Sequence, residues 1–188
     1  TPLYSSAASD VYKRQITIRG NNLAFGAGNV GIITSGSLTI EPTGTSFTAA
    51  LSTQKFTLPA LLTSATLGKV GNTGDITVAN AISTSGAITL TGGAIALNGA
   101  LSSTGGNIGI TSATLTGSSG ISIPSGGTLT ITQSGTSTYG GVISGGGAFT
   151  KAGAGELALS ATSTFTGATT ISVGTLALGG GGTSGWLN

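Results

Sequence analysis

Aliphatic residues along this chain recur at every second position, with threonine, serine or another small residue between them. The pattern is seen at Ile16/Ile18, Leu38/Ile40, Ile76/Val78, Ile88/Leu90, Ile95/Leu97, Ile108/Ile110, Ile121/Ile123, Leu129/Ile131, Leu157/Leu159, Ile171/Val173 and Leu176/Leu178. Period two is typical of a strand that buries one face and exposes the other. No segment keeps the i, i+3, i+4, i+7 spacing of an amphipathic helix. The pattern therefore predicts an all-β protein of short strands.

The interval between equivalent apolar positions is nearly constant in the middle of the chain. Three interleaved series repeat every 19 to 21 residues: Ile76, Ile95 and Leu115; Ile82, Leu101 and Ile121; Ile88, Ile108 and Leu129. A shared interval predicts three copies of one unit, at residues 74–92, 93–112 and 113–133. Each copy holds three short strands separated by turns of Gly, Asn or Ser.

Strands of three or four residues are not stable singly or as a hairpin, so each must pair with its equivalent in the next copy. This predicts a parallel β-solenoid with a triangular section, about twenty residues per turn and three strands per turn. At that length the chain would form roughly eight or nine turns. Residues 16–73 keep the composition but lose the regular interval, and we interpret them as further turns that carry loop insertions.

Composition narrows the functional classes. Among 188 residues there are 35 glycines, no histidine and no cysteine, and charged residues make up 5%. These counts exclude Cys/His zinc sites, catalysis by histidine or cysteine, and disulfides. A net charge of +2 is too small for a nucleic-acid surface. The mean hydropathy of +0.40 argues against disorder, which needs low hydrophobicity and high net charge.

The first fifteen residues do not share the strand pattern. They read TPLYSSAASDVYKRQ, which resembles the translation of a transposon adapter used in shotgun sequencing libraries. We therefore expect residues 1–15 to be a non-native segment and the native sequence to begin at Ile16, inside a longer reading frame.

A second resemblance lies near the other end of the chain. Tyr139–Ser160 reads YGGVISGGGAFTKAGAGELALS, and TFTG, TTI and GTL follow within 164–176. A lysine before Gly-x-Gly, a Leu-x-Leu strand, an aromatic-Thr-Gly corner and Gly-Thr-Leu together resemble the autotransporter-associated β-strand repeat. Phe165 in place of tyrosine and Ala168 in place of glycine depart from its usual pattern.

The segment 72–110, which opens with NTGDITV, resembles the rungs of filamentous-haemagglutinin-like adhesins. Both resemblances imply a right-handed parallel β-helix, with haemagglutinin-like turns over 16–133 and the autotransporter-associated repeat over 134–188. They also imply a secreted or cell-surface passenger of a Gram-negative bacterium whose parent protein has an outer-membrane translocator. Neither repeat carries catalytic residues of its own.

Candidate chemistry in the sequence is weak. Gly26–Gly31 fits G-x-G-x-x-G, but Ile32-Ile33-Thr34 follows it as a predicted strand, whereas a dinucleotide site needs a helix there. Asp75 and Glu156 are about four predicted turns apart, too far to act on one glycosidic bond. The glycine runs lack the repeated aspartate of calcium-binding repeats. We predict no catalytic, cofactor-binding or metal-binding residues.

Threonine and aromatic residues offer two possible binding surfaces. Regular threonine ladders on a solenoid can bind ice, but the expected equivalents of Thr114/Thr116 are Ala94/Ala96 and Asp75/Thr77, which predicts that no ladder forms. The aromatics Tyr139, Phe149, Phe165 and Trp186 could form a sugar-binding surface, and we favour core packing for most of them.

The sequence as a whole predicts a non-enzymatic rod for adhesion or display. Its expected partners are host-surface or extracellular-matrix molecules or neighbouring cells, with no nucleic acid, no cofactor and no membrane insertion by this segment. An alternative is a passive stalk whose activity lies outside these residues, in an adhesive tip or in a β-helical carbohydrate-active enzyme.

Overall fold

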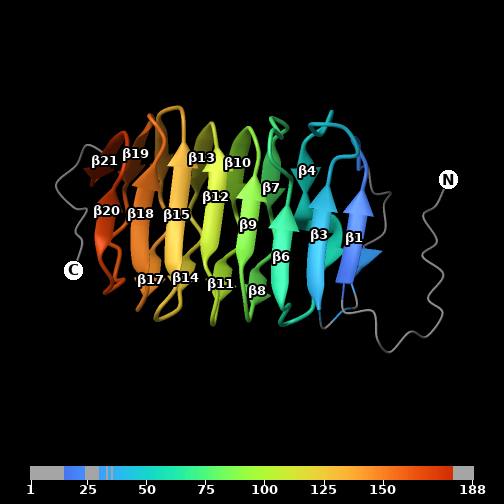
Figure 1. Cartoon of the computed structure of the whole chain (residues 1–188), viewed down its shortest axis with the longest axis horizontal. Coiled ribbons are helices and arrows are strands. Elements are labelled where there is room, and N and C mark those ends of the chain that lie inside the picture. The colour runs from blue at the N-terminus through green and yellow to red at the C-terminus, as the bar shows by residue number, and fades with distance from the viewer. Residues whose placement is uncertain (1–14, 24–29, 33, 35, 180–188) are drawn as a thin grey trace.

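The computed structural model describes residues 15–23, 30–32, 34 and 36–179. The chain winds into a parallel β-solenoid of about eight turns (Figure 1). In this view the front strands point upward, the chain crosses the top and descends behind them, and successive turns advance from right to left. This winding is right-handed. The predicted all-β, right-handed parallel β-helix is therefore confirmed.

The front of the rod is one continuous parallel sheet of eight strands. Its strands, in spatial order, are β1 (Gln15–Arg19), β3 (Ser37–Glu41), β6 (Ser64–Leu67), β9 (Ile88–Thr91), β12 (Ile108–Ser112), β15 (Thr128–Gln133), β18 (Ala148–Ala152) and β20 (Thr169–Ile171). The order follows the chain because each strand pairs with its equivalent one turn away. Gln15, the last residue of the adapter-like segment, opens β1 opposite Ser37; the other fourteen lie outside the described residues.

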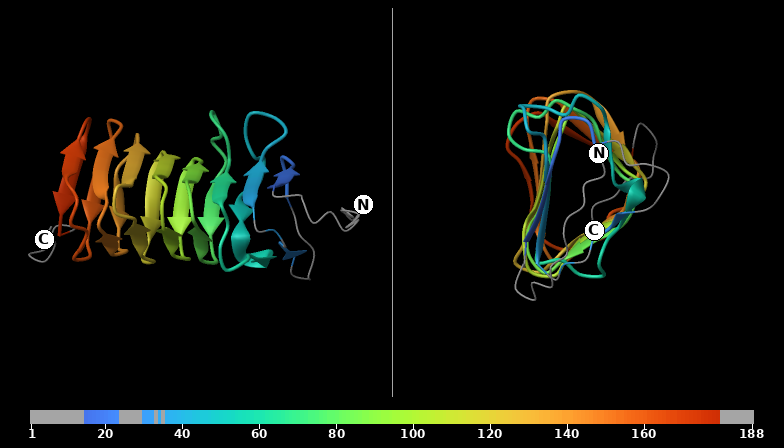
Figure 2. Two further views of the ribbon diagram at one scale, coloured as in Figure 1. Left: turned by 60° about the horizontal axis from the view of Figure 1, so that its bottom comes forward. Right: turned by 90° about the vertical axis from the view of Figure 1, so that its right-hand side faces the viewer.

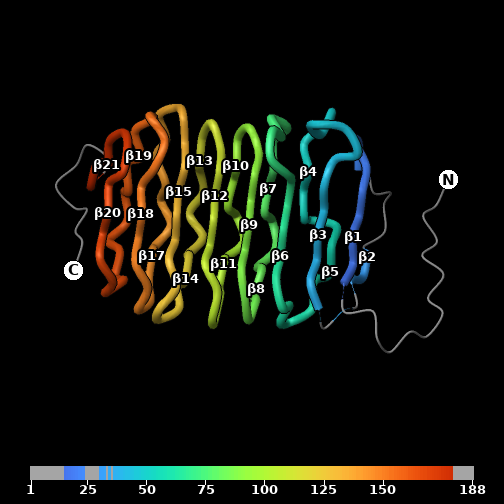
Figure 3. Tube along the Cα trace, in the orientation of Figure 1, coloured from blue at the N-terminus to red at the C-terminus, as the bar shows by residue number. Residues whose placement is uncertain are grey.

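Two further faces complete the section. The second face contains β4 (Leu51–Ser52), β7 (Ile76–Val78), β10 (Ala94–Leu97) and β13 (Thr114–Gly117), and a separate three-stranded sheet contains β16 (Ser137–Tyr139), β19 (Glu156–Leu159) and β21 (Thr175–Leu178). The third face contains β8 (Ile82–Thr84), β11 (Leu101–Ser103), β14 (Ile121–Ile123) and β17 (Ile143–Gly145). Near the first turns, β2 (Val30–Gly31) pairs with β5 (Phe56–Thr57), and Thr53–Lys55 form a 3-10 turn. Figure 3 shows these strands as successive turns of one coil.

The predicted stacking of aliphatic residues is confirmed on all three faces. Ile95 pairs with Ile76 and Leu115, Leu101 with Ile82 and Ile121, and Ile108 with Ile88 and Leu129. All nine side chains are at most 1% exposed. Each such burial contributes roughly 1.5–3 kcal/mol, so the stacked columns are the main source of stability.

The turns differ in length although their sections match. Thr17, Thr39, Thr66 and Thr89 are paired neighbours on the front sheet, yet they are 22, 27 and 23 positions apart. The extra residues lie outside the strands, so the register is kept. Seen along the rod, the coloured turns in the right-hand view of Figure 2 lie over one another around a common section. The loop insertions are therefore peripheral to the solenoid.

Candidate functional site

The glycine motif near the N-terminus does not lead into a helix. Residues 24–29, which hold most of it, lie outside the described residues. The next two residues, Val30 and Gly31, form strand β2 and pair with Phe56 and Thr57. A strand in this place cannot direct a helix N-terminus at a pyrophosphate, so the motif lacks the context that a dinucleotide site requires.

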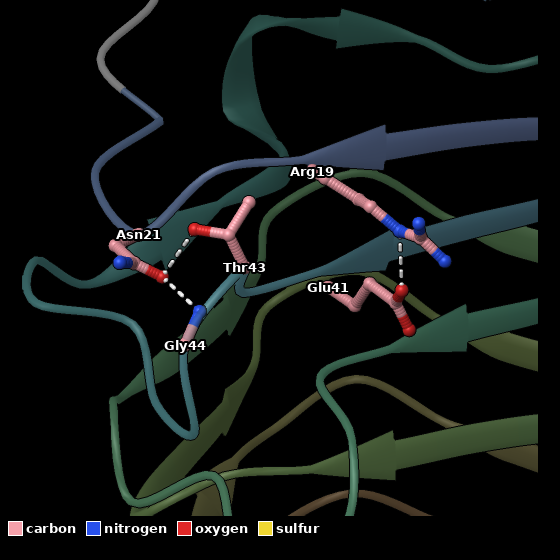
Figure 4. A network of polar contacts seen from close by, with 5 residues as sticks. All are labelled: Arg19, Asn21, Glu41, Thr43 and Gly44. Atoms are coloured by element: carbon pink, nitrogen blue, oxygen red, sulfur yellow. Dashed lines mark hydrogen bonds and ion pairs between the residues drawn. The ribbon is translucent and has the colours of Figure 1, made fainter.

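Two of the acidic side chains, Glu41 and Asp75, have separate structural partners. Glu41 accepts a hydrogen bond from Arg19 at 2.6 Å on the front sheet (Figure 4). Asp75 accepts one from the backbone N–H of Ala94 at 2.8 Å, which joins two turns. Within the described ranges no group of three or more His, Cys, Asp or Glu residues could hold a metal ion. The absence of catalytic, cofactor-binding and metal-binding residues stays a prediction.

Figure 4 also shows how the first two turns are joined beside this ion pair. The Asn21 Oδ1 atom accepts hydrogen bonds from the Thr43 hydroxyl at 2.9 Å and from the Gly44 N–H at 2.7 Å. The Asn21 carbonyl also accepts from the N–H of Thr48 at 2.7 Å. These contacts close the loop that follows β3, and they leave little of this polar cluster free for a ligand.

Lys151 lies in the interior of the solenoid. It pairs in β18 with Ile131 on one side and Ile171 on the other, at a register position that faces inward. Its side chain is 0% exposed, and burial lowers the pKa of the ammonium group from its usual range. The Nζ atom donates to the carbonyls of Ala152 and Gly153, both at 2.8 Å. This lysine therefore satisfies buried backbone acceptors at a corner of the solenoid.

The aromatic residues of the C-terminal turns are core residues. Tyr139 and Phe149 are 0% exposed and Phe165 is 3% exposed. The rings of Phe149 and Phe165 meet edge to face, with centroids 5.8 Å apart. Core packing is confirmed for these three, which removes them from any sugar-binding surface. Trp186 lies outside the described residues.

Threonine forms a ladder after all, and the prediction that it does not is wrong. The ladder lies on the front sheet, whereas Thr114 and Thr116 lie on the second face, where Ala94 and Ala96 do interrupt the column. Successive outward positions of the front sheet pair with one another, and we call this column the threonine ladder: Thr17, Thr39, Thr66, Thr89, Gly109, Thr130, Thr150 and Thr170. Unequal turn lengths hide the equivalence only from Thr17 to Thr89. From Thr89 to Thr170 the interval is 20 or 21 positions, so the regular spacing of Ile88, Ile108 and Leu129 could have revealed this part of the ladder.

A shorter serine ladder follows the third face. Ser83, Ser102, Ser122 and Ser144 are paired neighbours on β8, β11, β14 and β17. All four are half-buried and uncharged. The front and third faces of the rod therefore carry columns of hydroxyl groups, and these columns are the candidate binding surface.

The last turns match a known repeat family. Residues 149–178 match the family described as passenger-associated-transport-repeat. This segment of 30 residues, out of 188 in the chain, is similar to that repeat. The matched segment begins in β18 and ends with β21, so it covers about one and a half turns of the solenoid. With the solenoid, it fits an autotransporter passenger repeat protein, which is a secreted or cell-surface protein. No curated protein and no solved structure matches the chain.

Several residues of the matched segment stabilise the contact between neighbouring turns. Lys151 caps buried carbonyls, and Phe165 packs on Phe149. A Cβ atom at Gly167 would overlap the carbonyl of Gly147 in the preceding turn, so only glycine fits there. The motif thus specifies how one turn stacks on another.

Across the described part of the chain, no helix is long and apolar enough to span a membrane.

Proposed function

We propose that this chain is a rod segment of a Gram-negative autotransporter passenger, exported through an outer-membrane translocator and displayed at the cell surface without enzymatic activity. The observation that carries the proposal is the passenger-associated-transport-repeat at residues 149–178. Strand β18 of this repeat pairs with β15 over five residues, so the repeat continues the same solenoid.

We further propose that the rod itself is adhesive. The threonine ladder repeats at about 4.8 Å on each of the front strands except β12, where Gly109 leaves a gap, and few charges interrupt it. Such a surface favours many weak contacts with host-surface molecules, extracellular matrix or neighbouring cells, because each turn offers the same groups again. No nucleic acid is expected as a partner, since the net charge of +2 offers little attraction for phosphates.

A passive stalk is the second candidate, and the uniform section favours it. Successive turns overlie one another in Figure 2. A stalk needs only length and stiffness, which stacked turns provide. In that case the activity resides in another part of the parent protein, such as an adhesive tip or a carbohydrate-active enzyme.

Surface display tests the proposal. The chain is fused between a signal peptide and an outer-membrane barrel in a Gram-negative host, and protease accessibility on intact cells measures exposure. We expect the chain to be displayed, whereas retention in the periplasm would contradict a passenger role.

Adherence of the same cells to immobilised matrix proteins separates the two candidates. Removing residues 93–112 takes out one turn and leaves the flanking strands able to pair in register, since the paired positions Ile88, Ile108 and Leu129 follow one another turn by turn. An adhesive rod predicts binding above that of cells with the barrel alone, and a decrease after the deletion. A passive stalk predicts no binding in either case.

A further inference from the structure

The centre of the front sheet carries a two-column grid of threonines. On β9, β12 and β15 the outward positions are Thr89 and Thr91, Gly109 and Thr111, and Thr130 and Thr132. The register pairs Thr89 with Gly109 and Gly109 with Thr130, and it pairs Thr91 with Thr111 and Thr111 with Thr132. We call these six positions the threonine grid. Five of them are threonine, and Gly109 is the single gap.

The grid has regular spacing in two directions. Neighbouring turns are about 4.8 Å apart along the rod, and positions i and i+2 of a strand are about 6.6 Å apart. The inward residues between the columns, Leu90, Ile110 and Ile131, are at most 1% exposed. Because close-packed residues hold the strands in place, the outward threonines are held in a fixed array.

The hydroxyls of the grid and of the whole threonine ladder are free. Among the described residues they form no hydrogen bond with the protein, whereas Thr84 on the third face donates to the Gly86 carbonyl. None of the grid threonines is buried. Each therefore presents a hydroxyl and a methyl group to solvent, and water is the partner available to it.

Charged and aromatic groups are missing from this face between Ser64 and Ile171. The one charged residue in these front strands is Lys151, which is buried on the inner side. An anionic ligand would find no cation there. A sugar would find no aromatic ring, because Phe149 faces the core. A ligand suited to this face is neutral, has a surface that repeats in two dimensions, and can contact both hydroxyl and methyl groups.

We propose that the front sheet binds ice through the threonine grid, with the threonine ladder extending the contact along the rod. Ice presents water oxygens in a regular two-dimensional lattice with spacings of the same order as the grid. Threonine hydroxyls take part in the hydrogen bonds of the surface waters, and the methyl groups lie between them. The array is already rigid, so little side-chain order has to be gained on contact. This activity is independent of adhesion to cells.

Ice-affinity partition of the purified chain tests the proposal. Growing ice should enrich the protein several-fold over a non-binding reference protein, and the chain should slow ice recrystallisation. Thr130→Lys places a long charged side chain at the edge of the grid and should reduce both effects to the level of the reference. Thr138→Lys is the matched control, because Thr138 is an exposed outward residue of β16 on the second face. It should leave both effects unchanged.

A gain-of-function variant makes the test independent of folding damage. A Cβ atom at Gly109 meets nothing within 4 Å, so Gly109→Thr fits and completes the grid. We expect this variant to slow recrystallisation at a several-fold lower concentration than the unchanged chain, with an unaltered circular dichroism spectrum. The proposal is overturned if the unchanged chain is excluded from ice. It is also overturned if Thr138→Lys is as damaging as Thr130→Lys, or if insoluble cellulose or chitin captures the chain while ice does not.

Discussion

The Nζ atom of Lys151 donates a hydrogen bond to the carbonyl of Val173 at 3.4 Å, which ties β18 to the next turn from inside the solenoid. With the bonds to Ala152 and Gly153, the ammonium group serves three backbone acceptors around one corner. A buried cation is tolerated here because its hydrogen-bond donors are used. Lys151 and these three carbonyls therefore form a polar cluster within an otherwise apolar core, and we call this cluster the lysine joint.

Lys151→Met should destabilise the C-terminal turns. Methionine has a similar length but leaves the three carbonyls without their donor, and an unsatisfied buried group costs about 1–3 kcal/mol. Urea unfolding followed by circular dichroism measures the change. Lys69→Met is the matched control, because Lys69 is in a loop and has no side-chain hydrogen bond among the described residues. Equal stability of the two variants would contradict a stabilising role for Lys151 in the lysine joint.

Tyr139 should make the fold sensitive to alkali. Its hydroxyl donates to the Ser119 carbonyl, and burial raises its pKa above the usual range. An unfolded tyrosine ionises near pH 10, so the stability from the neutral hydroxyl is intact below about pH 10 and is lost as the pH rises further. Tyr139→Phe should lower the free energy of unfolding near neutral pH by about 1 kcal/mol. The free energy of unfolding of this variant should then fall less in alkali than that of the unchanged chain.

Urea unfolding of both proteins at a series of pH values tests this expectation. Lys151 titrates in both, so the difference between the two curves isolates the tyrosine. The gap between the free energies of unfolding should stay constant below about pH 10 and should narrow over the alkaline range above it. Parallel curves over that range would show that Tyr139 ionises as easily in the folded protein as in the unfolded one.

Gly117 should not tolerate a side chain. Its φ is 123°, and an added Cβ atom would overlap the Leu97 carbonyl of the preceding turn. Gly117→Ala should therefore cost about 1–3 kcal/mol. Gly109→Ala is the control: nothing lies within 4 Å of the added atom, and alanine should be neutral or stabilising by up to about 1 kcal/mol. Thermal unfolding compares the two, and the prediction fails if they unfold alike.

Asn72 should be needed to close its corner. Its Oδ1 accepts from the N–H groups of Phe47 and Gly74, at 3.0 and 3.1 Å, and its Nδ2 donates to the Thr91 carbonyl at 2.7 Å. Asn72→Ala removes partners in two neighbouring turns and should cost about 1–3 kcal/mol. Asn98→Ala, at an exposed turn, should cost far less. The ranking is checked by urea unfolding, and a reversed order would refute it.

Much of the solenoid could be predicted because its core is a repeated local pattern. The interval between Ile76, Ile95 and Leu115 predicted that they stack, and they are paired neighbours on the second face. A strand of this length has no stable partner except its own equivalent, so the interval implies the winding. Core packing was also expected for most of the C-terminal aromatic residues, and Phe149 is buried.

The first turns of the threonine ladder could not be predicted from a fixed repeat interval. Thr17, Thr39 and Thr66 are paired neighbours, but insertions outside the strands make their intervals unequal. Loop length changes the count along the chain without changing the register, because only the strands must pair. Thr114 and Thr116 lie instead on the second face, where alanines break the column.

The sequence by itself determined the period-two strands, the turn of about twenty residues and the identity of the stacked aliphatic columns, because these follow from side-chain alternation and spacing. Only the tertiary structure decided which threonines of the first turns share a column and that Lys151 faces inward. Both depend on atoms far apart in sequence: the first on register between turns of unequal length, and the second on carbonyls of two turns that meet around one ammonium group.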